Sequence, residues 1–485
     1  MTDYQTKLRE NLRQRYEKKK ILVLGFGREG QTTYHFLRRL LPNQHLWIMD
    51  ANEMKAEQPI FWSEGENGYD SKVSLLYGEH YLQNLNDFDM VFKTPGLPAF
   101  LLGDLEKEKI TSQTNEFVAA IGEKVIGITG TKGKSTTSSL VSESLNALGK
   151  DVTLVGNIGK PALELLLEDE EEKLYVYEMS SHQTQFLRFV PRVAVVLNLF
   201  EEHLDNYIDY ADYIEAKLNI GKALFENPDK KSLFIHGCDN AKLMEYRERW
   251  QHCRHAAFGH LEKNEFAENG IFIEENQIVS FLATGEKTIL TDKDFPRKLL
   301  GEHNLVNALV AFLVVQELEG LNADNVESTC KAIGAFEGLA HRLEYFGDYR
   351  GIAFYDDSIS TIPAAVMEAI HSIEKLQTLI IGGFDRGISY DQFVRDLNNH
   401  PELHLICLPD TGHKLFPELC HKVKFQAGDM TAAVELAYRL TDRGRACVLS
   451  PAAASYGFYQ NFEERGSDFK EKVRAFSKVG KKYEE

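Results

Sequence analysis

Short apolar runs that end in glycine or an acidic residue recur along the whole chain. One covers residues 21–25 and another residues 124–130, and each is followed by a glycine-rich turn and a segment of helical periodicity. A third set begins near residue 350 and includes residues 378–383 and 446–451. Continuous strands rich in Val, Ile and Leu that alternate with helices are typical of parallel sheets covered on both faces. The pattern therefore predicts an α/β fold.

The length of the chain and the change of motif at each strand–helix set indicate three domains. A chain of 485 residues is too long for one ordinary core. We expect a Rossmann-like domain over residues 1–119, a central P-loop ATPase-type domain with a parallel sheet over residues 120–337, and a C-terminal Rossmann-like α/β domain over residues 338–485. The first 19 residues are highly charged, and we expect an exposed helix there.

Composition narrows the choice of partners. The chain carries 55 Lys and Arg against 73 Asp and Glu, a net charge of −18, which argues against non-specific nucleic-acid binding. The apolar run near residues 305–315 is short and is interrupted by Asn307, so it predicts a buried helix rather than membrane insertion. The N-terminus has no apolar signal core, and the six cysteines are scattered. We expect a cytoplasmic monomer with reduced thiols that acts on small molecules.

A first glycine motif follows the strand at residues 21–25. It reads Gly25-Phe-Gly27-Arg28-Glu29-Gly30, and Asp50 stands at the end of the next strand. The glycines permit a tight turn and let backbone N–H groups approach a pyrophosphate, while an acid at the second strand end can accept a ribose or base hydrogen bond. The motif fits NAD, FAD or a UDP-sugar equally, and a purely structural turn is the alternative.

A second glycine motif, at residues 127–136, is more specific. A strand, a glycine loop, Lys134-Ser135 and a helix occur in the order that a phosphate cradle requires. Backbone amides can wrap the phosphates, Lys134 can neutralise their charge, and the Ser135 hydroxyl can bind Mg²⁺. The strict Walker spacing has glycine where this chain has Ile128, so the loop is a variant with Gly130 inside it.

Further polar residues follow later strands and helices. Glu178 ends a strand and offers the hard oxygen ligand that a Mg²⁺ site needs. His203 follows the next strand, and Lys217 lies in a helical stretch after it. Asn304 and Asn307 share one helix face and can read an adenine edge. Taken singly, each also has a plain structural interpretation as a packed side chain or a helix cap.

In this order the segments resemble the Mur ligase superfamily. The resemblance rests on the variant P-loop, the E-x-S-S strand end at Glu178, the E-x-H-x-D turn at His203 with its downstream A-K, the G-x-H-N-x-x-N helix and the pair His341-Arg342. Residues 449–466 look specifically like the MurD branch of that superfamily. The likeness covers the chain from about residue 20 to residue 479 and implies the three-domain plan given above.

The resemblance implies a substrate and a set of ligands for each domain. The N-terminal domain would hold the UDP of UDP-N-acetylmuramoyl-L-alanine, through residues Gly27, Arg28, Glu29, Gly30 and Asp50, with Asn157 touching the substrate in the central cleft. The ATP site would comprise Gly130, Thr131, Lys132, Gly133, Lys134, Ser135 and Thr136 at the phosphates, Asn304 and Asn307 at the adenine, Arg342 at the γ-phosphate and Asp357 near the nucleotide. Two Mg²⁺ ions would be held by Ser135 and Glu178 and by His203 and Lys217, the lysine being carbamylated in this family.

The implied reaction is formation of an amide bond through an acyl phosphate. ATP would phosphorylate the L-alanine carboxylate, and the amine of glutamate would displace the phosphate. Lys134, Lys217, His203 and Arg342 are the expected catalytic residues, because charge develops on the transferred phosphoryl group.

The chain departs from the MurD pattern at two cationic positions. Ile359 stands where a lysine is usual, and Arg386 replaces another lysine. Arginine binds a carboxylate in a bidentate, planar way, so the two residues are not equivalent. The expected glutamate pocket comprises Thr361, Arg386, Ser455, Tyr456 and Phe462. We expect D-glutamate as the acceptor, with L-glutamate as the alternative.

Three other classes of function stay open at this point. A dinucleotide oxidoreductase would explain the first glycine motif but not the second. Another ligase of the superfamily, including one that polyglutamylates folate, would keep the central domain but not residues 449–466. A non-catalytic nucleotide-binding protein would bind ATP without releasing phosphate.

Overall fold

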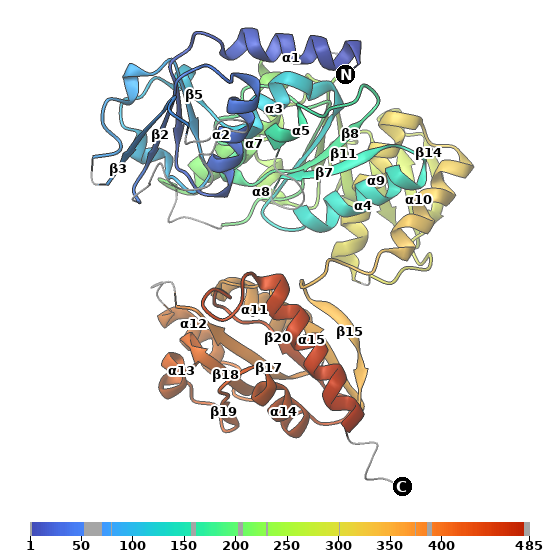
Figure 1. Ribbon diagram of the computed structural model, residues 1–485. Coiled ribbons are helices and arrows are strands. Elements are labelled where there is room, and N and C mark those ends of the chain that lie inside the picture. Colours follow the sequence, from blue (N-terminus) through green and yellow to red (C-terminus); the bar gives the residue numbers. More distant parts are fainter. Residues whose placement is uncertain are drawn as a thin grey trace. The chain divides into compact units, whose positions relative to one another are not determined.

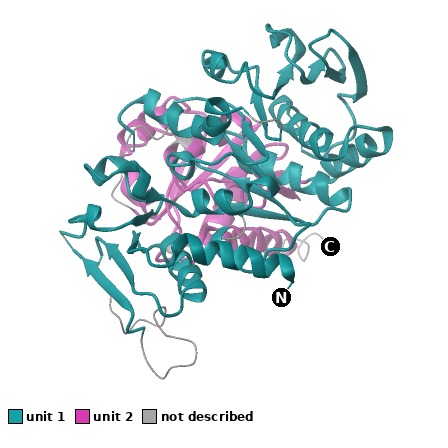
Figure 2. Ribbon diagram, turned by 90° about the horizontal axis from the view of Figure 1, so that it is seen from above, with its two compact units in different colours: residues 1–336 teal, residues 337–485 magenta. Residues whose placement is uncertain are grey.

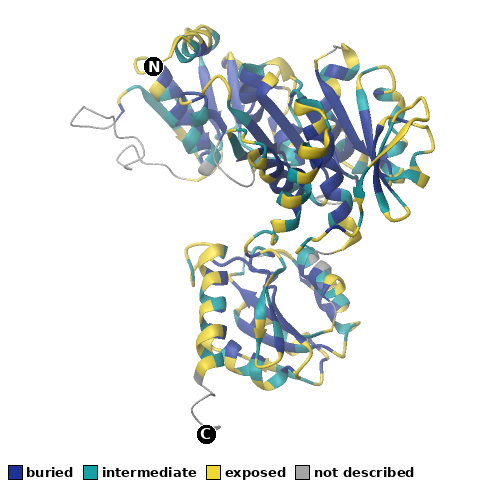
Figure 3. Cartoon of the chain, turned by 90° about the vertical axis from the view of Figure 1, so that its right-hand side faces the viewer, coloured by how far each residue is buried: buried dark blue, intermediate teal, exposed yellow. Residues whose placement is uncertain are grey.

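A computed structural model describes residues 2–52, 70–78, 80–156, 162–201, 207–228, 231–299, 301–373, 375–385 and 390–479. The chain divides into two compact units, residues 1–336 and 337–485 (Figure 2). Each unit is built on sheet structure whose central strands are buried (Figure 3). No helix in the described ranges combines the length and the apolar character needed to cross a bilayer.

The first sheet of unit 1 has five strands in the order β3-β2-β1-β4-β5, all parallel. The order reverses at β1, so the ends of β1 and β4 open a crevice where ligands bind in folds of this kind. The strands are β1 (Ile21–Leu24), β2 (Leu46–Asp50), β3 (Val73–Tyr77), β4 (Met90–Lys93) and β5 (Ile110–Thr111). The helices of this part are α1 (Asp3–Tyr16), α2 (Arg28–Leu40) and α3 (Gln113–Ile121).

Helix α1 is not the exposed helix that its charge predicts. Thr2 caps it in a reciprocal capping box with Gln5. Leu8, Leu12 and Tyr16 are spaced four residues apart and form a buried stripe. The charged residues occupy the rest of the surface, so their number in the sequence concealed a narrow apolar face.

The second sheet of unit 1 has nine strands in the order β14-β13-β12-β11-β10-β9-β6-β8-β7. It is parallel from β12 to β7, and β13 and β14 extend it as an antiparallel edge. The strands are β6 (Val125–Thr129), β7 (Val152–Gly156), β8 (Leu174–Glu178), β9 (Val193–Val196), β10 (Leu233–Gly237), β11 (His255–His260), β12 (Gly270–Glu274), β13 (Gln277–Phe281) and β14 (Lys287–Asp292).

Helices cover both faces of this sheet. α4 (Lys134–Ala147), α9 (Glu302–Glu319) and α10 (Ala323–Ala335) pack together on one face (Figure 1). The other helices are α5 (Ala162–Leu165), α6 (Ser181–Thr184), α7 (Tyr210–Glu226) and α8 (Ala241–Met244). One apolar core joins residues of α1, α2 and β1 to residues of β6, β8 and α7. The first two sheets are therefore held together by shared packing.

Unit 2 has one six-stranded sheet in the order β15-β16-β20-β17-β18-β19. Only β15 is antiparallel to its neighbour. The strands are β15 (Glu344–Tyr349), β16 (Ile352–Asp356), β17 (Leu376–Gly383), β18 (His404–Asp410), β19 (Lys424–Gln426) and β20 (Ala446–Leu449). The helices are α11 (Pro363–Ser372), α12 (Asp391–Asn398), α13 (Thr411–Leu415), α14 (Met430–Leu440) and α15 (Phe462–Val479), and each face of the sheet has its own core. The predicted α/β fold class is confirmed, while the domain boundaries near residues 119 and 338 stay predictions.

Candidate functional site

The first glycine turn connects β1 to α2 and leaves no room for a side chain at Gly25 or Gly30. A Cβ atom at Gly30 would collide with the carbonyl oxygen of Gly25, so the helix can approach the turn only because residue 30 is glycine. Asp50, at the end of β2, accepts a hydrogen bond from the backbone N–H of Phe26 at 2.6 Å. The predicted acid therefore secures the turn from the neighbouring strand, in addition to facing the cavity beside it.

A cavity of about 590 Å³ opens at the carboxyl ends of β1, β2 and β4 and extends to the ends of β7 and β8. Gly27, Glu29 and Asp50, three of the residues expected to bind UDP, line it. Gly30 packs under the turn instead, and the side chain of Arg28 and the whole of Asn157 lie outside the described residues. The lining also includes residues that the sequence interpretation missed, namely Thr94, Pro95, Gly96, Gln113, Tyr177, Ser180 and Gln183. The Thr-Pro-Gly turn directly after β4 was the available signal for the first three.

Glu29, which lines the cavity, interacts electrostatically with Lys93 at the end of β4. Burial raises the pKa of Glu29 to about 7, against the opposing attraction of Lys93. Burial lowers the pKa of Lys93 to about 8. Among the described residues, Glu29 Oε1 has no hydrogen-bond partner. A buried acceptor of this kind is costly unless a donor reaches it, so a ligand donor is a natural partner.

The phosphate loop joins β6 to α4 and is fixed from the neighbouring strand. Thr131 N–H donates to the carbonyl oxygen of Asn198 at 3.0 Å, and Lys132 N–H donates to the Asn198 side chain at 2.8 Å. Gly133 has a φ of +83°, which disfavours other residues, and its Cβ position lies 2.8 Å from Asn307 Oδ1. Ile128 is buried and pairs with Glu178 across the sheet, so the strand simply continues where a Walker loop would already turn.

Two lysines from different helices meet at one carbonyl group of this loop. Lys134 Nζ, at the start of α4, donates to Gly130 O at 2.9 Å and to Thr131 O at 2.8 Å. Lys217 Nζ, from α7, donates to Gly130 O at 2.7 Å. Lys217 is 2% exposed although it carries an ammonium group. The structure thus brings the distant Lys217 to the loop, as its assignment to the site requires.

The other residues predicted to bind ATP or Mg²⁺ near the loop differ in where they lie and in whether the structure describes them. Ser135 and Glu178 are buried at the first turn of α4 and at the end of β8, next to β6. Asn307 lies against Gly133, with Asn304 one turn earlier on α9, and Thr136 is half-buried in α4. His203 lies outside the described residues.

The end of β8 separates the cavity from the phosphate loop. Successive residues of a strand point to opposite faces. Tyr177 lines the cavity, whereas Glu178 pairs in register with Ile128 of β6, directly before the loop. The two candidate subsites therefore share one strand end within unit 1.

In unit 2 the expected nucleotide residues lie around the ends of β16 and β20. Asp357 is buried, and burial raises its pKa to about 6. Its carboxylate accepts hydrogen bonds from Ser450 Oγ at 2.6 Å and from Leu343 N–H at 3.1 Å. Arg342 is exposed between His341 and Leu343, which both have positive φ. The strained backbone presents the Arg342 side chain outward.

The expected glutamate residues are only partly brought together. Ser455 lines a cavity of about 210 Å³ at the ends of β17, β18 and β20. Tyr456 is exposed, Thr361 is half-buried and Phe462 begins α15, and none of them lines this cavity. Arg386 lies outside the described residues. Ile359 occupies the position of the missing lysine and donates its N–H to the carbonyl oxygen of His341 at 3.1 Å.

Comparison with known proteins gives a consistent result. Residues 128–315 match the family model of the Mur ligase middle domain. Over 473 residues the chain is 31% identical to the UDP-N-acetylmuramoylalanine–D-glutamate ligase of Clostridium botulinum (strain Hall), covering 94% of this chain and 97% of that protein. It is 32% identical over 465 residues to the protein of the same name from Geotalea daltonii, covering 95% and 98%. The crystal structure of MurF ligase from Thermotoga maritima in complex with ADP shares the fold, with a TM-score of 0.52 and 15% identity over 96% of both chains.

Proposed function

Because the chain belongs to the Mur ligase family, among the UDP-N-acetylmuramoylalanine–D-glutamate ligases, we propose that it joins glutamate to UDP-N-acetylmuramoyl-L-alanine with the consumption of ATP. The product is an amide, with ADP and phosphate as by-products, and it serves peptidoglycan precursor synthesis. The observation that carries the proposal is the meeting of Lys134 and Lys217 at the Gly130 carbonyl, in a phosphate loop that shares a strand end with the large cavity.

The loop is suited to the phosphates of ATP. The start of α4 offers backbone N–H donors and a positive helix end, and Lys134 adds a full charge. Ser135 and Glu178 provide hard oxygen ligands beside it, which fits Mg²⁺. His203 and a carbamylated Lys217 are our proposed ligands for a second Mg²⁺, since an ammonium cannot bind a cation. When bound, Mg²⁺ screens phosphate charge.

The nucleotide sugar occupies the cavity of about 590 Å³ in this proposal. The turn at Gly27 faces the pyrophosphate, and Glu29 and Asp50 offer acceptors for donors of the uridine or its ribose. Because Tyr177 and Glu178 are consecutive, a substrate seated in the cavity can extend its L-alanine carboxylate past the end of β8 toward the loop. That direction is what phosphoryl transfer requires.

The reaction then proceeds in two steps. A carboxylate oxygen attacks the γ-phosphorus, the bond to ADP breaks, and an acyl phosphate forms. The glutamate amine attacks the acyl carbon, the carbon–oxygen bond to phosphate breaks, and the amine loses a proton. Lys134 and Arg342 stabilise the charge that develops on the transferred group, while Asn304 and Asn307 orient the adenine and Asp357 positions the nucleotide.

Residues of unit 2 are the proposed contacts for glutamate. Thr361, Arg386, Ser455, Tyr456 and Phe462 are the proposed contacts, and D-glutamate is the acceptor named for the relatives. L-glutamate is the second candidate, because Ile359 replaces a lysine in the segment that ends at Thr361. An apolar side chain there cannot pair with a carboxylate, and this changes the charge that selects the enantiomer.

Phosphate release from ATP tests the function directly. We expect release only when UDP-N-acetylmuramoyl-L-alanine and one glutamate enantiomer are both present. Lys134→Ala should abolish it, whereas Lys222→Ala, on the exposed side of α7, should not. If no phosphate is released with either glutamate enantiomer, the proposal is contradicted. Phosphate release that does not need the nucleotide sugar would also contradict it. Activity with L- but not D-glutamate would select the second candidate.

We also infer a reducing, cytoplasmic environment. None of the six cysteines forms a disulfide bond, and Cys238, Cys407 and Cys447 are buried. Disulfides are rare in proteins of reducing compartments, and a chain with six cysteines outside disulfide bonds is typical of them.

A further inference from the structure

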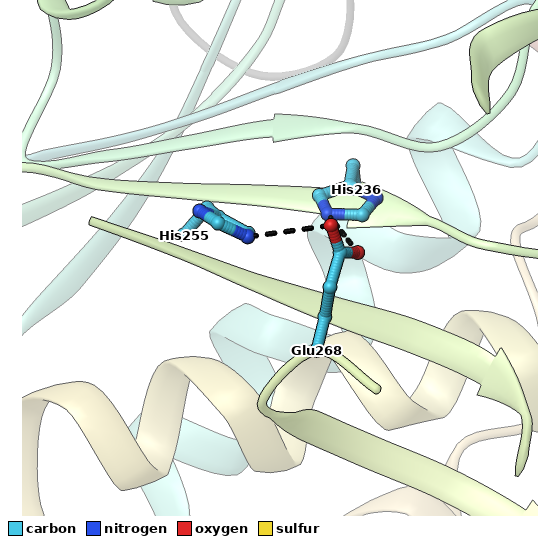
Figure 4. A group of neighbouring side chains, drawn as sticks. All are labelled: His236, His255 and Glu268. Carbon is cyan, nitrogen blue, oxygen red and sulfur yellow. Dashed lines mark ion pairs between the residues drawn. The ribbon is translucent and has the colours of Figure 1, made fainter. Parts of the chain in front are cut away.

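Two histidines and a glutamate form a largely buried cluster at β10, β11 and the approach to β12, away from the residues assigned to the ligase reaction. His236 is the fourth residue of β10, and Glu268 lies two residues before β12 (Figure 4). His255 opens β11 and pairs in register with Phe234, two residues before His236. Residues two apart on a strand share a face, so both imidazoles project from the same side of the sheet. His236 is 0% exposed and Glu268 is 4% exposed.

The nitrogen and oxygen atoms of the cluster lie at ion-pair distances from one another, but not all of them complete a hydrogen bond of good geometry. His236 Nε2 is 3.0 Å from Glu268 Oε2, and His255 Nε2 is 3.4 Å from Glu268 Oε1. Yet within the part of the chain that the structure describes, neither ring nitrogen of His236 nor Glu268 Oε2 has a hydrogen-bond partner of acceptable geometry. Buried polar atoms are almost always paired, so these atoms point to something that binds between them.

His255 makes a hydrogen bond through its other ring nitrogen, Nδ1. His255 Nδ1 lies 3.0 Å from the carbonyl oxygen of Cys253, and a carbonyl can only accept, so Nδ1 carries the proton. In the neutral ring Nε2 then turns a lone pair toward a carboxylate oxygen. Two electron-rich atoms that face each other in a buried site need a cation between them, which is either a proton on Nε2 or a metal ion.

We propose that His236, His255 and Glu268 bind a divalent transition-metal ion of the zinc class. One donor atom from each residue lies within 4.8 Å of the others. Zinc–nitrogen distances near 2.0 Å place tetrahedral ligand atoms roughly 3.4 Å apart, so side-chain movements of about an ångström bring the three atoms to metal-binding distances. Two imidazoles and one carboxylate favour zinc-like ions over Mg²⁺ or Ca²⁺, which prefer oxygen ligands.

The surroundings support the cluster as a metal site. Arg247 Nε donates to Glu268 Oε1 at 2.8 Å, and its guanidinium lies 4.0 Å from the centroid of the Phe266 ring, which fixes the carboxylate and leaves Oε2 for the ion. The rings of Trp250 and Phe234 pack 5.0 and 6.0 Å from the His236 ring, and a water molecule would complete the tetrahedron as the fourth ligand. The ion would tie β10, β11 and the entry to β12 together, and its role is structural.

Cobalt binding tests this proposal on the untagged full chain. The chain is stripped with a chelator, supplied with excess Mg²⁺ to fill oxygen-rich sites, and titrated with Co²⁺. We expect one Co²⁺ per chain with the intense visible bands of tetrahedral nitrogen ligation, and a higher Tm when Zn²⁺ replaces it. Glu268→Gln keeps the volume and should weaken binding about tenfold or more. His255→Asn should do the same.

The matched control is His252→Asn, because His252 is exposed and lies outside the cluster. It should bind Co²⁺ as the unaltered chain does. Circular dichroism establishes that each variant is folded before titration. Absence of tetrahedral bands in the unaltered chain, or bands that persist in both Glu268→Gln and His255→Asn, would overturn the proposal and leave a proton shared by the cluster as the occupant.

Discussion

The carbonyl oxygen of Gly130 receives two ammonium groups, from Lys134 and from Lys217, which is 2% exposed. Burial of a lysine costs free energy unless a partner or a ligand compensates it. Two cations beside one loop, the half-buried Lys134 and the buried Lys217 in its unmodified form, are suited to a ligand with several negative charges. Sequence alone indicated Lys134 through its motif, but Lys217 stands 83 residues away from it, and only the family resemblance suggested its role.

Substitution of Lys217 tests that role. Lys217→Ala should lower kcat about 100-fold or more, because a group that organises charge at the transferred phosphoryl is removed. A short-chain carboxylate added to the assay should restore part of the activity if the carbamate is what the reaction needs. Lys222→Ala, one turn further along α7, serves as control. Turnover of Lys217→Ala equal to that of the unaltered chain would reject the assignment.

The ionisation of Glu29 should make the stability of the folded protein depend on pH. Its pKa in the folded protein is raised from 4.5 to about 7, so between these values the folded state binds more protons than the unfolded state. The contribution of Glu29 to the free energy of unfolding therefore falls as pH rises from about 4.5 to 7. Above pH 7 the destabilisation by the ionised carboxylate reaches its full size. Glu29→Gln should be more stable than the unaltered chain at pH 8, by up to about 3 kcal/mol, and equal to it near pH 4.5.

Urea unfolding at both pH values measures this difference. Glu10→Gln, at an exposed position on α1, controls for the general effect of removing one negative charge. A Glu29→Gln variant that is less stable at pH 8 would show that the carboxylate is favourably paired in the folded protein.

At the scale of elements, the positions of strands along the chain were far easier to predict than which strands pair side by side in a sheet. The runs at residues 21–25 and 124–130 correspond to β1 and β6 within one residue at each end, because buried parallel strands are continuously apolar. The antiparallel edge formed by β13 and β14 was not predicted, since no local pattern says which strand pairs with which. The same reason hid the cluster of His236, His255 and Glu268, whose members have no motif spacing.

Helix α1 shows how charge can mislead. Leu12 is 2% exposed although its neighbours are largely charged. Leu12→Ala should destabilise the chain by about 2–4 kcal/mol, because it leaves a cavity in the core that joins the two sheets of unit 1. Glu10→Ala, on the exposed face, should change stability by less than about 0.5 kcal/mol. Equal effects of the two changes in urea unfolding would support the exposed helix that composition predicts.

At the scale of the whole molecule, unit 1 contains both candidate subsites of the proposed reaction. The cavity beside the first sheet and the phosphate loop of the second belong to one compact unit with a shared core. Such packing fixes the two subsites relative to each other. The overall α/β plan followed from the sequence, whereas the cavity did not, because its walls come from seven or more separate turns and strand ends brought together only by folding.

The central claim is that the γ-phosphoryl group of ATP passes to a carboxylate of the nucleotide sugar. Transfer of oxygen-18 tests it most directly, with both carboxylate oxygens of the L-alanine moiety labelled and with glutamate and Mg-ATP supplied. The acyl-phosphate route predicts that each phosphate released carries one labelled oxygen, because the carbon–oxygen bond breaks when the amine attacks. Unlabelled phosphate released at the full rate of turnover would contradict the mechanism.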